Sequence, residues 1–201
     1  MALEQKLNSI GGVGLSLGKD ERAIRDNQWV EGVNKGERKA FEEIYRCYYP
    51  QLGPFLLRYV NSEKVAEDII HNVFYKVWEN RERLRADGTL KAYLFKAVQN
   101  QAFKYLAKNK GENTVELSDK TTQSDTDNNP EIILELKEFK EAYRYALKKL
   151  PEKRRNIFLM HREDHLTYRE ISEVLNISIK TVETQISRSM KFLIDQLSRF
   201  R

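Results

Sequence analysis

A cluster of polar and charged side chains near residue 180 has the composition of a surface that contacts DNA. Lysine and arginine bind phosphates or guanine, serine and threonine bind phosphates or base edges, and glutamate can accept a hydrogen bond from the cytosine amino group. The cluster comprises Ser178, Lys180, Thr181, Glu183, Thr184, Ser187 and Arg188. These residue types predict a surface that enters a groove of DNA.

Two short amphipathic helices, within residues 166–188, are expected to position this cluster. Apolar residues at helical spacing mark their buried stripes: Tyr168, Ile171, Val174 and Leu175 in the first helix, Val182 and Ile186 in the second. Asn176 tolerates the left-handed conformation that ends a helix, and Ser178 is a suitable N-cap for the next one. The pattern predicts a helix-turn-helix, and it favours DNA reading over an ordinary helical hairpin with a solvated polar face.

A second candidate surface lies on a helix predicted over residues 90–110. This segment carries five lysines (91, 96, 104, 108 and 110), no acidic residue and four interleaved aromatic residues. Lysines contact backbone phosphates and aromatic rings stack on unpaired bases, so the mixture suits single-stranded or melted DNA. Aromatic residues at helical spacing are also typical of a core. We therefore predict that Phe95 and Phe103 are buried and that Tyr93 is the residue that contacts a base.

The cleanest amphipathic helix is predicted over residues 63–80. Its apolar residues step by three and four: Ala66, Ile69, Ile70, Val73, Phe74, Val77 and Trp78. The opposite face carries Glu67, Asp68, His71, Asn72, Tyr75, Lys76 and Glu79. Before it, residues 27–60 predict two helices with a break between Pro50 and Pro54, and residues 81–89 predict a polar loop.

Residues 111–130 differ in composition from the segments on either side. They contain five acidic residues, one lysine and ten Ser, Thr, Asn or Gln residues. Such a stretch buries too little apolar surface to offset its chain entropy, which predicts a flexible acidic linker. Residues 1–26 are expected to form a flexible N-terminal extension, and helical periodicity returns over residues 131–201. The fold class is therefore all-α, with two helical domains.

Several function classes are disfavoured by composition. A chain of 201 residues with 32% charged residues indicates a soluble protein, without a transmembrane segment or secretory leader. The single cysteine, Cys47, suits a reducing cytosol. His161 and His165 have the spacing of a zinc pair on a continuous helix, but a bend into the helix-turn-helix favours another role. We identify no catalytic motif, and we predict no cofactor and no metal site.

Three motifs in this order resemble those of the group-four, extracytoplasmic-function (ECF) sigma factors of the sigma-70 family. They are residues 66–78 (AEDIIHNVFYKVW), residues 91–106 (KAYLFKAVQNQAFKYL) and residues 150–158 (LPEKRRNIF), the last continuing into the helix-turn-helix. The resemblance covers about residues 27–201 and is closest to the iron-citrate-type sigma factors common in Bacteroidetes. It implies a sigma region 2 domain over residues 27–110 and a sigma region 4 domain over residues 131–201.

The resemblance also implies a role for each surface. Glu67, Asp68, His71, Asn72 and Tyr75 would bind the coiled coil of the polymerase β′ clamp, although the family usually has Gln and Glu at positions 71 and 72. The −10 element would be recognised and melted by a second set: Lys91, Tyr93, Lys96, Asn100 and Lys104. The cluster from Ser178 to Arg188 would read the −35 element, with Glu183 departing from the basic residue that is common there.

The resulting hypothesis is a cytoplasmic, non-enzymatic initiation factor. Its partners would be core RNA polymerase, promoter DNA and an anti-sigma factor. The main alternative is a free-standing helix-turn-helix regulator whose N-terminal part senses a ligand or dimerises. A third class, an interaction protein that captures polymerase or a sigma factor without reading DNA, fits the basic helix of residues 90–110 poorly.

Overall fold

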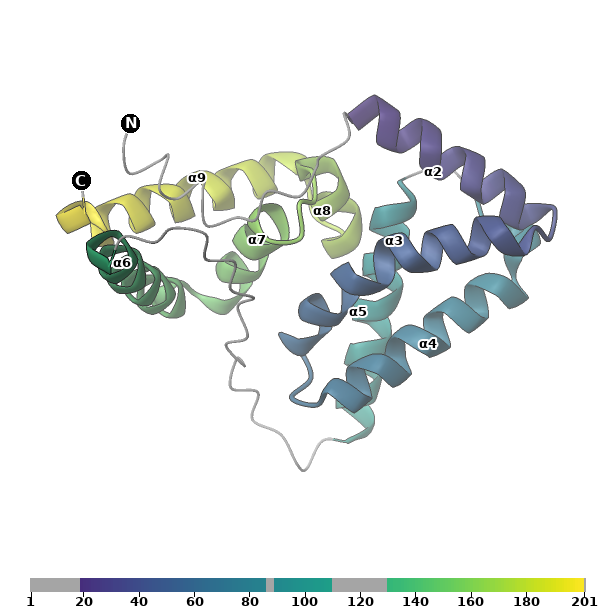
Figure 1. Ribbon diagram of the computed structural model, residues 1–201, viewed down its shortest axis with the longest axis horizontal. Coiled ribbons are helices and arrows are strands. Elements are labelled where there is room, and N and C mark those ends of the chain that lie inside the picture. Colours follow the sequence, from purple (N-terminus) through teal and green to yellow (C-terminus); the bar gives the residue numbers. More distant parts are fainter. Residues whose placement is uncertain (1–18, 86–88, 110–129, 201) are drawn as a thin grey trace. The chain divides into compact units, whose positions relative to one another are not determined.

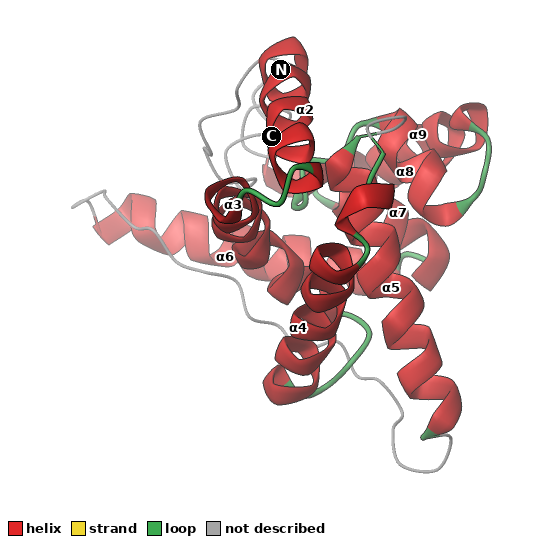
Figure 2. Cartoon of the chain, turned by 90° about the vertical axis from the view of Figure 1, so that its right-hand side faces the viewer, coloured by secondary structure: helices red, strands yellow, loops and turns green. Residues whose placement is uncertain are grey.

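The structure, a computed structural model, describes residues 19–85, 89–109 and 130–200 (Figure 1). The elements in chain order are α2 (Lys19–Asn34), α3 (Arg38–Leu57), α4 (Glu63–Glu79), the 3-10 helix η1 (Arg81–Arg83), α5 (Leu90–Lys108), α6 (Pro130–Lys149), α7 (Glu152–Arg162), α8 (Tyr168–Leu175), α9 (Ile179–Gln196) and the 3-10 helix η2 (Ser198–Phe200). These described ranges contain no strand (Figure 2), so the all-α prediction is confirmed. They form two compact units, one built from α2 to α5 and the other mainly from α6 to α9.

The first unit is organised around α3, which contacts α2, α4 and α5. Its buried stripe, Ile44, Tyr48, Leu52, Phe55 and Leu56, follows the helical period and is at most 1% exposed. The stripe that residues 63–80 predicted on α4 is buried as expected, except that Trp78 is half-buried. Burial of these apolar side chains supplies the main stabilisation of the unit.

Helix α3 corrects the predicted break at the prolines, because it runs without interruption through Pro50 and Pro54. A proline inside a helix costs about 3 kcal/mol through the lost hydrogen bond and the ring clash. Burying each large apolar side chain stabilises the folded state by roughly 1.5–3 kcal/mol. The stripe from Tyr48 to Leu56 flanks both prolines, so the buried side chains outweigh the local penalty.

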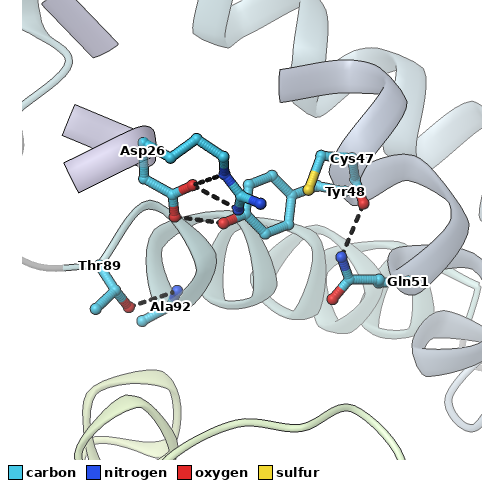
Figure 3. A network of polar contacts seen from close by, with 7 residues as sticks. Asp26, Cys47, Tyr48, Gln51, Thr89 and Ala92 are labelled. Atoms are coloured by element: carbon cyan, nitrogen blue, oxygen red, sulfur yellow. Dashed lines mark hydrogen bonds and ion pairs between the residues drawn. The ribbon is translucent and has the colours of Figure 1, made fainter. Parts of the chain in front are cut away.

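Helix α2 corrects the expected N-terminal boundary, because it begins at Lys19 and residues 19–26 are helical. Asp26 is only 3% exposed. It accepts hydrogen bonds from the Tyr48 hydroxyl of α3 and from the Arg25 guanidinium (Figure 3). Burial, followed by the negative charge of Asp26, raises the pKa of Tyr48, so the hydroxyl remains a donor. Residues 1–18 lie outside the described residues.

A close approach joins α2 to the start of α3. A Cβ placed on Gly32 would lie 2.7 Å from the Cβ of Ala40, so only glycine fits there without a shift. Gly36, in the turn between the two helices, has a φ of 81°, which a glycine adopts without strain. The two glycines therefore fix how α2 packs on α3.

The second unit is closed by α9, which contacts α6 and α7. One buried cluster of this unit comprises Phe139, Tyr143, Ala146, Leu147, Leu150, Phe158, Leu159, Leu193 and Leu197. Residues 111–129 of the expected linker lie outside the described residues, and Pro130 begins α6. In the part of the chain that is described, no helix has the length and apolar character needed to cross a membrane.

Candidate nucleic-acid and polymerase interfaces

The helix-turn-helix is built by local hydrogen bonds at the start of each of its two helices. Thr167 and Glu170 form a capping box at the start of α8, with the Thr167 amide donating to Glu170 Oε2 over 2.7 Å. Asn176 ends α8 in the left-handed conformation, with φ 52° and ψ 49°. Ser178 Oγ then caps α9 by accepting from the Thr181 amide at 3.1 Å. The predicted roles of Asn176 and Ser178 are confirmed, whereas sequence reasoning missed the capping box.

The polar cluster of α9 forms one continuous exposed face. Val182, Ile186 and Ser189 are buried on the opposite side of the helix. All seven residues of the predicted cluster are exposed: Ser178, Lys180, Thr181, Glu183, Thr184, Ser187 and Arg188. The Thr184 hydroxyl donates to the Lys180 carbonyl at 2.8 Å, so its oxygen remains available as an acceptor. Such an acceptor suits the amino group of adenine or cytosine in the major groove.

Two further residues at α9 were not found from the sequence. Ile179 is 44% exposed beside the cluster and offers an apolar surface that can contact a thymine methyl. Gln185 accepts a hydrogen bond from Arg154 Nε of α7 at 3.1 Å, which fixes α9 on the helix behind it. Neither residue interrupts the buried stripe, so helical periodicity gave no signal for them.

The candidate surface on α5 is a stripe on one side of the helix, which we call the α5 face. It contains Tyr93, which is 48% exposed, and the exposed residues Lys96, Asn100 and Lys104. At roughly 100° per residue these positions fall within about 100° of arc. Thr89 caps the helix by accepting from the Ala92 amide at 3.2 Å (Figure 3). The face therefore combines an aromatic ring, an amide and two ammonium groups.

Two expectations for α5 are wrong, and the rotation of the helix explains both. Lys91 is only 3% exposed and its ammonium lies 5.6 Å from the centroid of the Phe95 ring, because it stands roughly 200° around the helix from Tyr93. Phe103, expected in the core, is 49% exposed on the α5 face. Phe95 is buried as predicted. The i+3 relation of Phe103 to Asn100 is the signal that could have placed it.

Helix α2 anchors the segment that leads into α5. Asn34 Nδ2 donates to the Leu84 carbonyl at 3.2 Å, and the Leu84 side chain is buried. Arg81 lies over the Trp78 ring at 5.1 Å and donates to the Trp78 carbonyl at 3.2 Å. Residues 81–83 thus form a 3-10 turn within the expected loop, while residues 86–88 lie outside the described residues.

The polar face of α4 is also exposed and continues onto α3. Glu67, Asp68, His71, Asn72 and Tyr75 are all exposed. The Tyr45 hydroxyl of α3 lies 3.3 Å from His71 Nε2. Tyr49 stacks against the same imidazole with ring centroids 6.0 Å apart. Burial, followed by interactions with Tyr49 and Glu67, raises the pKa of the Tyr45 hydroxyl.

The two histidines with zinc-like spacing do not share a helix. Helix α7 ends at Arg162, and His165 has a φ of 52°. His161 Nδ1 lies 3.0 Å from the Leu166 carbonyl, so this imidazole helps to hold the entry to the helix-turn-helix. Within the described ranges, no group of three or more His, Cys, Asp or Glu side chains has an arrangement that could hold a metal ion.

Comparison with protein families matches both units. Residues 44–112 match the family described as sigma-70 region 2, and residues 140–193 match sigma-70 region 4. The first match includes the α4 and α5 faces, and the second includes the helix-turn-helix. A free-standing regulator would not need a region 2 domain at its N-terminal side. The matches therefore favour the sigma-factor hypothesis.

Individual relatives and solved structures agree with these matches. The chain is 25% identical to the ECF RNA polymerase sigma-E factor of Escherichia coli K12 over 182 residues, covering 83% of this chain and 91% of the relative. It is also 25% identical to the ECF RNA polymerase sigma factor SigW of Bacillus subtilis over 176 residues, covering 84% and 94%.

The fold resembles that of CnrH in its complex with the cytosolic domain of CnrY, with a TM-score of 0.59, 18% identity, and coverage of 87% of this chain and 98% of CnrH. It equally resembles the sigma factor RpoE of Bartonella quintana in complex with the anti-sigma factor NepR, with a TM-score of 0.59, 18% identity, and coverage of 81% and 99%. The chain belongs to the sigma-70 family of RNA polymerase sigma factors, in its ECF group. It is a non-enzymatic initiation factor that directs RNA polymerase to promoters.

Proposed function

We propose that the exposed faces of α4, α5 and α9 divide the work of this sigma factor. The α4 face, comprising Glu67, Asp68, His71, Asn72 and Tyr75, binds the coiled coil of the polymerase β′ clamp. The α5 face contacts the −10 element and helps to open it. The polar face of α9, from Ser178 to Arg188, reads the −35 element in the major groove. Residues 111–130, which are rich in acidic side chains, link the two DNA-reading domains.

The observation that carries this proposal is the segregation of side-chain types among the three faces. The α4 face has two carboxylates, the α5 face has lysines and no acidic residue, and the α9 face has hydroxyl groups with charges of both signs. Phosphate binding requires cations, and base reading in a duplex requires mixed donors and acceptors. An acidic face fits a basic protein surface rather than DNA.

We also propose that an anti-sigma factor holds the protein inactive in the cytoplasm. Solved relatives are bound to the cytosolic domain of CnrY and to the anti-sigma factor NepR, which supports such a partner. A partner that covers the α4 face would compete directly with polymerase. Asn72 Nδ2 donates to the Asp68 carbonyl at 2.8 Å and so keeps its amide oxygen available on that face.

Run-off transcription with purified core RNA polymerase tests the proposal. Addition of this chain should produce promoter-specific transcripts from a panel of candidate promoters, and core polymerase alone should not. A chain that binds duplex DNA without polymerase and yields no specific transcript would instead be a regulator. The double variant Glu67→Lys and Asp68→Lys should abolish transcripts by preventing assembly with core polymerase, whereas Lys137→Ala on α6 should leave them unchanged.

A further inference from the structure

Phe103 is an exposed aromatic ring that the family resemblance did not assign to any function. Of the nine phenylalanines, all of which lie in the described part of the chain, only Phe103 has an exposed side chain, at 49%. A single exposed apolar residue needs no explanation by itself. The surroundings of Phe103, however, give its ring a fixed position and a charged rim.

Buried neighbours hold the Phe103 ring in place. The ring lies perpendicular to that of Tyr59, with centroids 5.5 Å apart and an interplanar angle of 84°. Tyr59 is 8% exposed and its hydroxyl accepts a hydrogen bond from Gln99 Nε2 at 2.9 Å. Tyr59 also packs on Phe55, with centroids 5.2 Å apart. A ring supported in this way is ordered before any ligand arrives, which lowers the entropy cost of binding.

The residues beside Phe103 suit a nucleic-acid strand. Asn100 lies one helical turn before it and Lys104 follows it directly, both exposed on the α5 face. Helix α5 has no acidic residue along its length, so no carboxylate of this helix repels phosphate. Aromatic rings beside lysines are the combination that binds single strands, with stacking on the bases and ion pairing to the backbone.

Phe103 and Tyr93 are too far apart to contact the same base. They are ten residues apart on one helix, which corresponds to roughly 15 Å at 1.5 Å per residue. A strand that follows the α5 face would therefore meet the rings at different nucleotides. Lys96 and Asn100 lie between the two rings, where the backbone and the base edges of that strand would pass.

We propose that Phe103 stacks on an unpaired base of the opened promoter strand, at a nucleotide distinct from the one that contacts Tyr93. This inference rests on the proposed function of α5 in promoter opening. Two other occupants would fit such a ring: a thymine methyl, or an apolar side chain of a protein partner. The experiment below separates all three.

The test uses holoenzyme assembled from the full chain and purified core polymerase. A random pool of single-stranded 12-mers is selected with wild-type holoenzyme, and each position of the selected sequence is then replaced by an abasic site. Affinities are measured for the wild type and for Phe103→Ala, Phe103→Leu and Phe103→Trp. Tyr145→Ala is the matched control, because Tyr145 is a 64% exposed aromatic residue on α6, in the other compact unit.

If Phe103 stacks on a base, Phe103→Ala and Phe103→Leu should weaken strand binding by about 5- to 100-fold. Phe103→Trp should retain the affinity, and Tyr145→Ala should not change it. At one position, an abasic site should weaken strand binding by the wild type by a similar factor and should hardly change strand binding by Phe103→Ala. Because leucine keeps the apolar volume beside Tyr59, its loss of affinity would not reflect unfolding.

Other outcomes overturn the inference. If Phe103→Leu bound single strands with wild-type affinity, the contact would be an apolar one of the methyl type. If every abasic site weakened Phe103→Ala by the same factor as the wild type, no base would stack on Phe103. A loss of core-polymerase affinity in Phe103→Ala would indicate a protein contact. If wild-type holoenzyme selected no sequence and gave no specific transcripts, the proposed function itself would fail. If the wild type gave specific transcripts and Phe103→Ala bound single strands as tightly as the wild type, only the stacking by Phe103 would be rejected.

Discussion

The α5 face and the polar face of α9 differ in the kind of DNA that each is chemically equipped to contact. Two exposed aromatic rings, Tyr93 and Phe103, stand among lysines on α5, whereas α9 presents hydroxyl groups, an acid and two cations without an aromatic ring. Flat rings bind bases that have left the stack, and mixed donors and acceptors read the edges of paired bases. A promoter that must be both located and opened requires both kinds of surface.

The largest effect should come from removing the two cations of the polar face of α9, Lys180 and Arg188. The double variant Lys180→Ala and Arg188→Ala should weaken holoenzyme binding to −35 duplex by more than roughly 10-fold, because each contact to phosphate or guanine contributes about 1–3 kcal/mol. Fluorescence anisotropy on labelled duplex measures this loss, and its salt slope should become shallower. Affinity for core polymerase should not change. An equal fall in core affinity would reject the assignment of this face to DNA.

Tyr93 offers the complementary test on α5. Tyr93→Ala should slow promoter opening and weaken single-strand binding by about 1–3 kcal/mol, because the base loses its stacking partner. Tyr93→Phe, which keeps the ring, should behave almost like the wild type. Potassium permanganate reactivity of unpaired thymines measures opening. Should Tyr93→Ala instead weaken −35 duplex binding while opening proceeds normally, the division between the two faces would be wrong.

Weakening the capping box tests whether the helix-turn-helix can lose stability without a loss of stability in the unit that contains α5. Thr167→Ala removes the hydroxyl that accepts from the Glu170 amide at 3.2 Å, and an N-cap of this kind contributes about 1 kcal/mol. Hydrogen exchange should accelerate in α8 and not in α5, since the two helices belong mainly to different units. Thr167→Ser keeps the hydroxyl and is the matched control. Faster exchange in α5 as well would mean that the units unfold together.

The elements predicted best from the sequence were those in which apolar periodicity and capping residues agree, namely α4, α8 and α9. The first half of α2, residues 19–26, was missed because its apolar Ile24 is exposed and its buried residue is the polar Asp26. The break in α3 was predicted from a local rule about proline that long-range burial overrides. On α5 the composition indicated lysines and aromatic rings on one helix. It could not place Lys91 and Phe103, because side-chain exposure depends on how the helix is rotated against α3.

Two buried tyrosines, Tyr48 in the first unit and Tyr143 in the second, extend the comparison to alkaline pH. Burial is the first cause that raises the pKa of each, followed by the negative charge of Asp26 for Tyr48 and of Glu163 for Tyr143. In the unfolded chain tyrosine ionises near pH ~10. Above that pH the unfolded state loses a proton that the folded state keeps. The stability from each tyrosine is therefore complete below pH ~10 and falls as the pH rises further, by about 1 kcal/mol at pH 10.5.

Tyrosine-to-phenylalanine variants assign this loss to each unit. Both tryptophans, Trp29 and Trp78, lie in the first unit, so their fluorescence follows the unfolding of α2 to α5 alone, whereas circular dichroism follows both units. Tyr48→Phe should reduce the loss of stability at alkaline pH that fluorescence detects, and Tyr143→Phe should leave that loss unchanged. Tyr48→Phe should also lower stability at neutral pH, because buried Asp26 loses a donor. The measurement covers roughly pH 9 to 10.5, where free tyrosine ionises. If the unfolding free energy seen by fluorescence fell equally with pH in the wild type and in Tyr48→Phe, this hydroxyl would not couple α2 to α3.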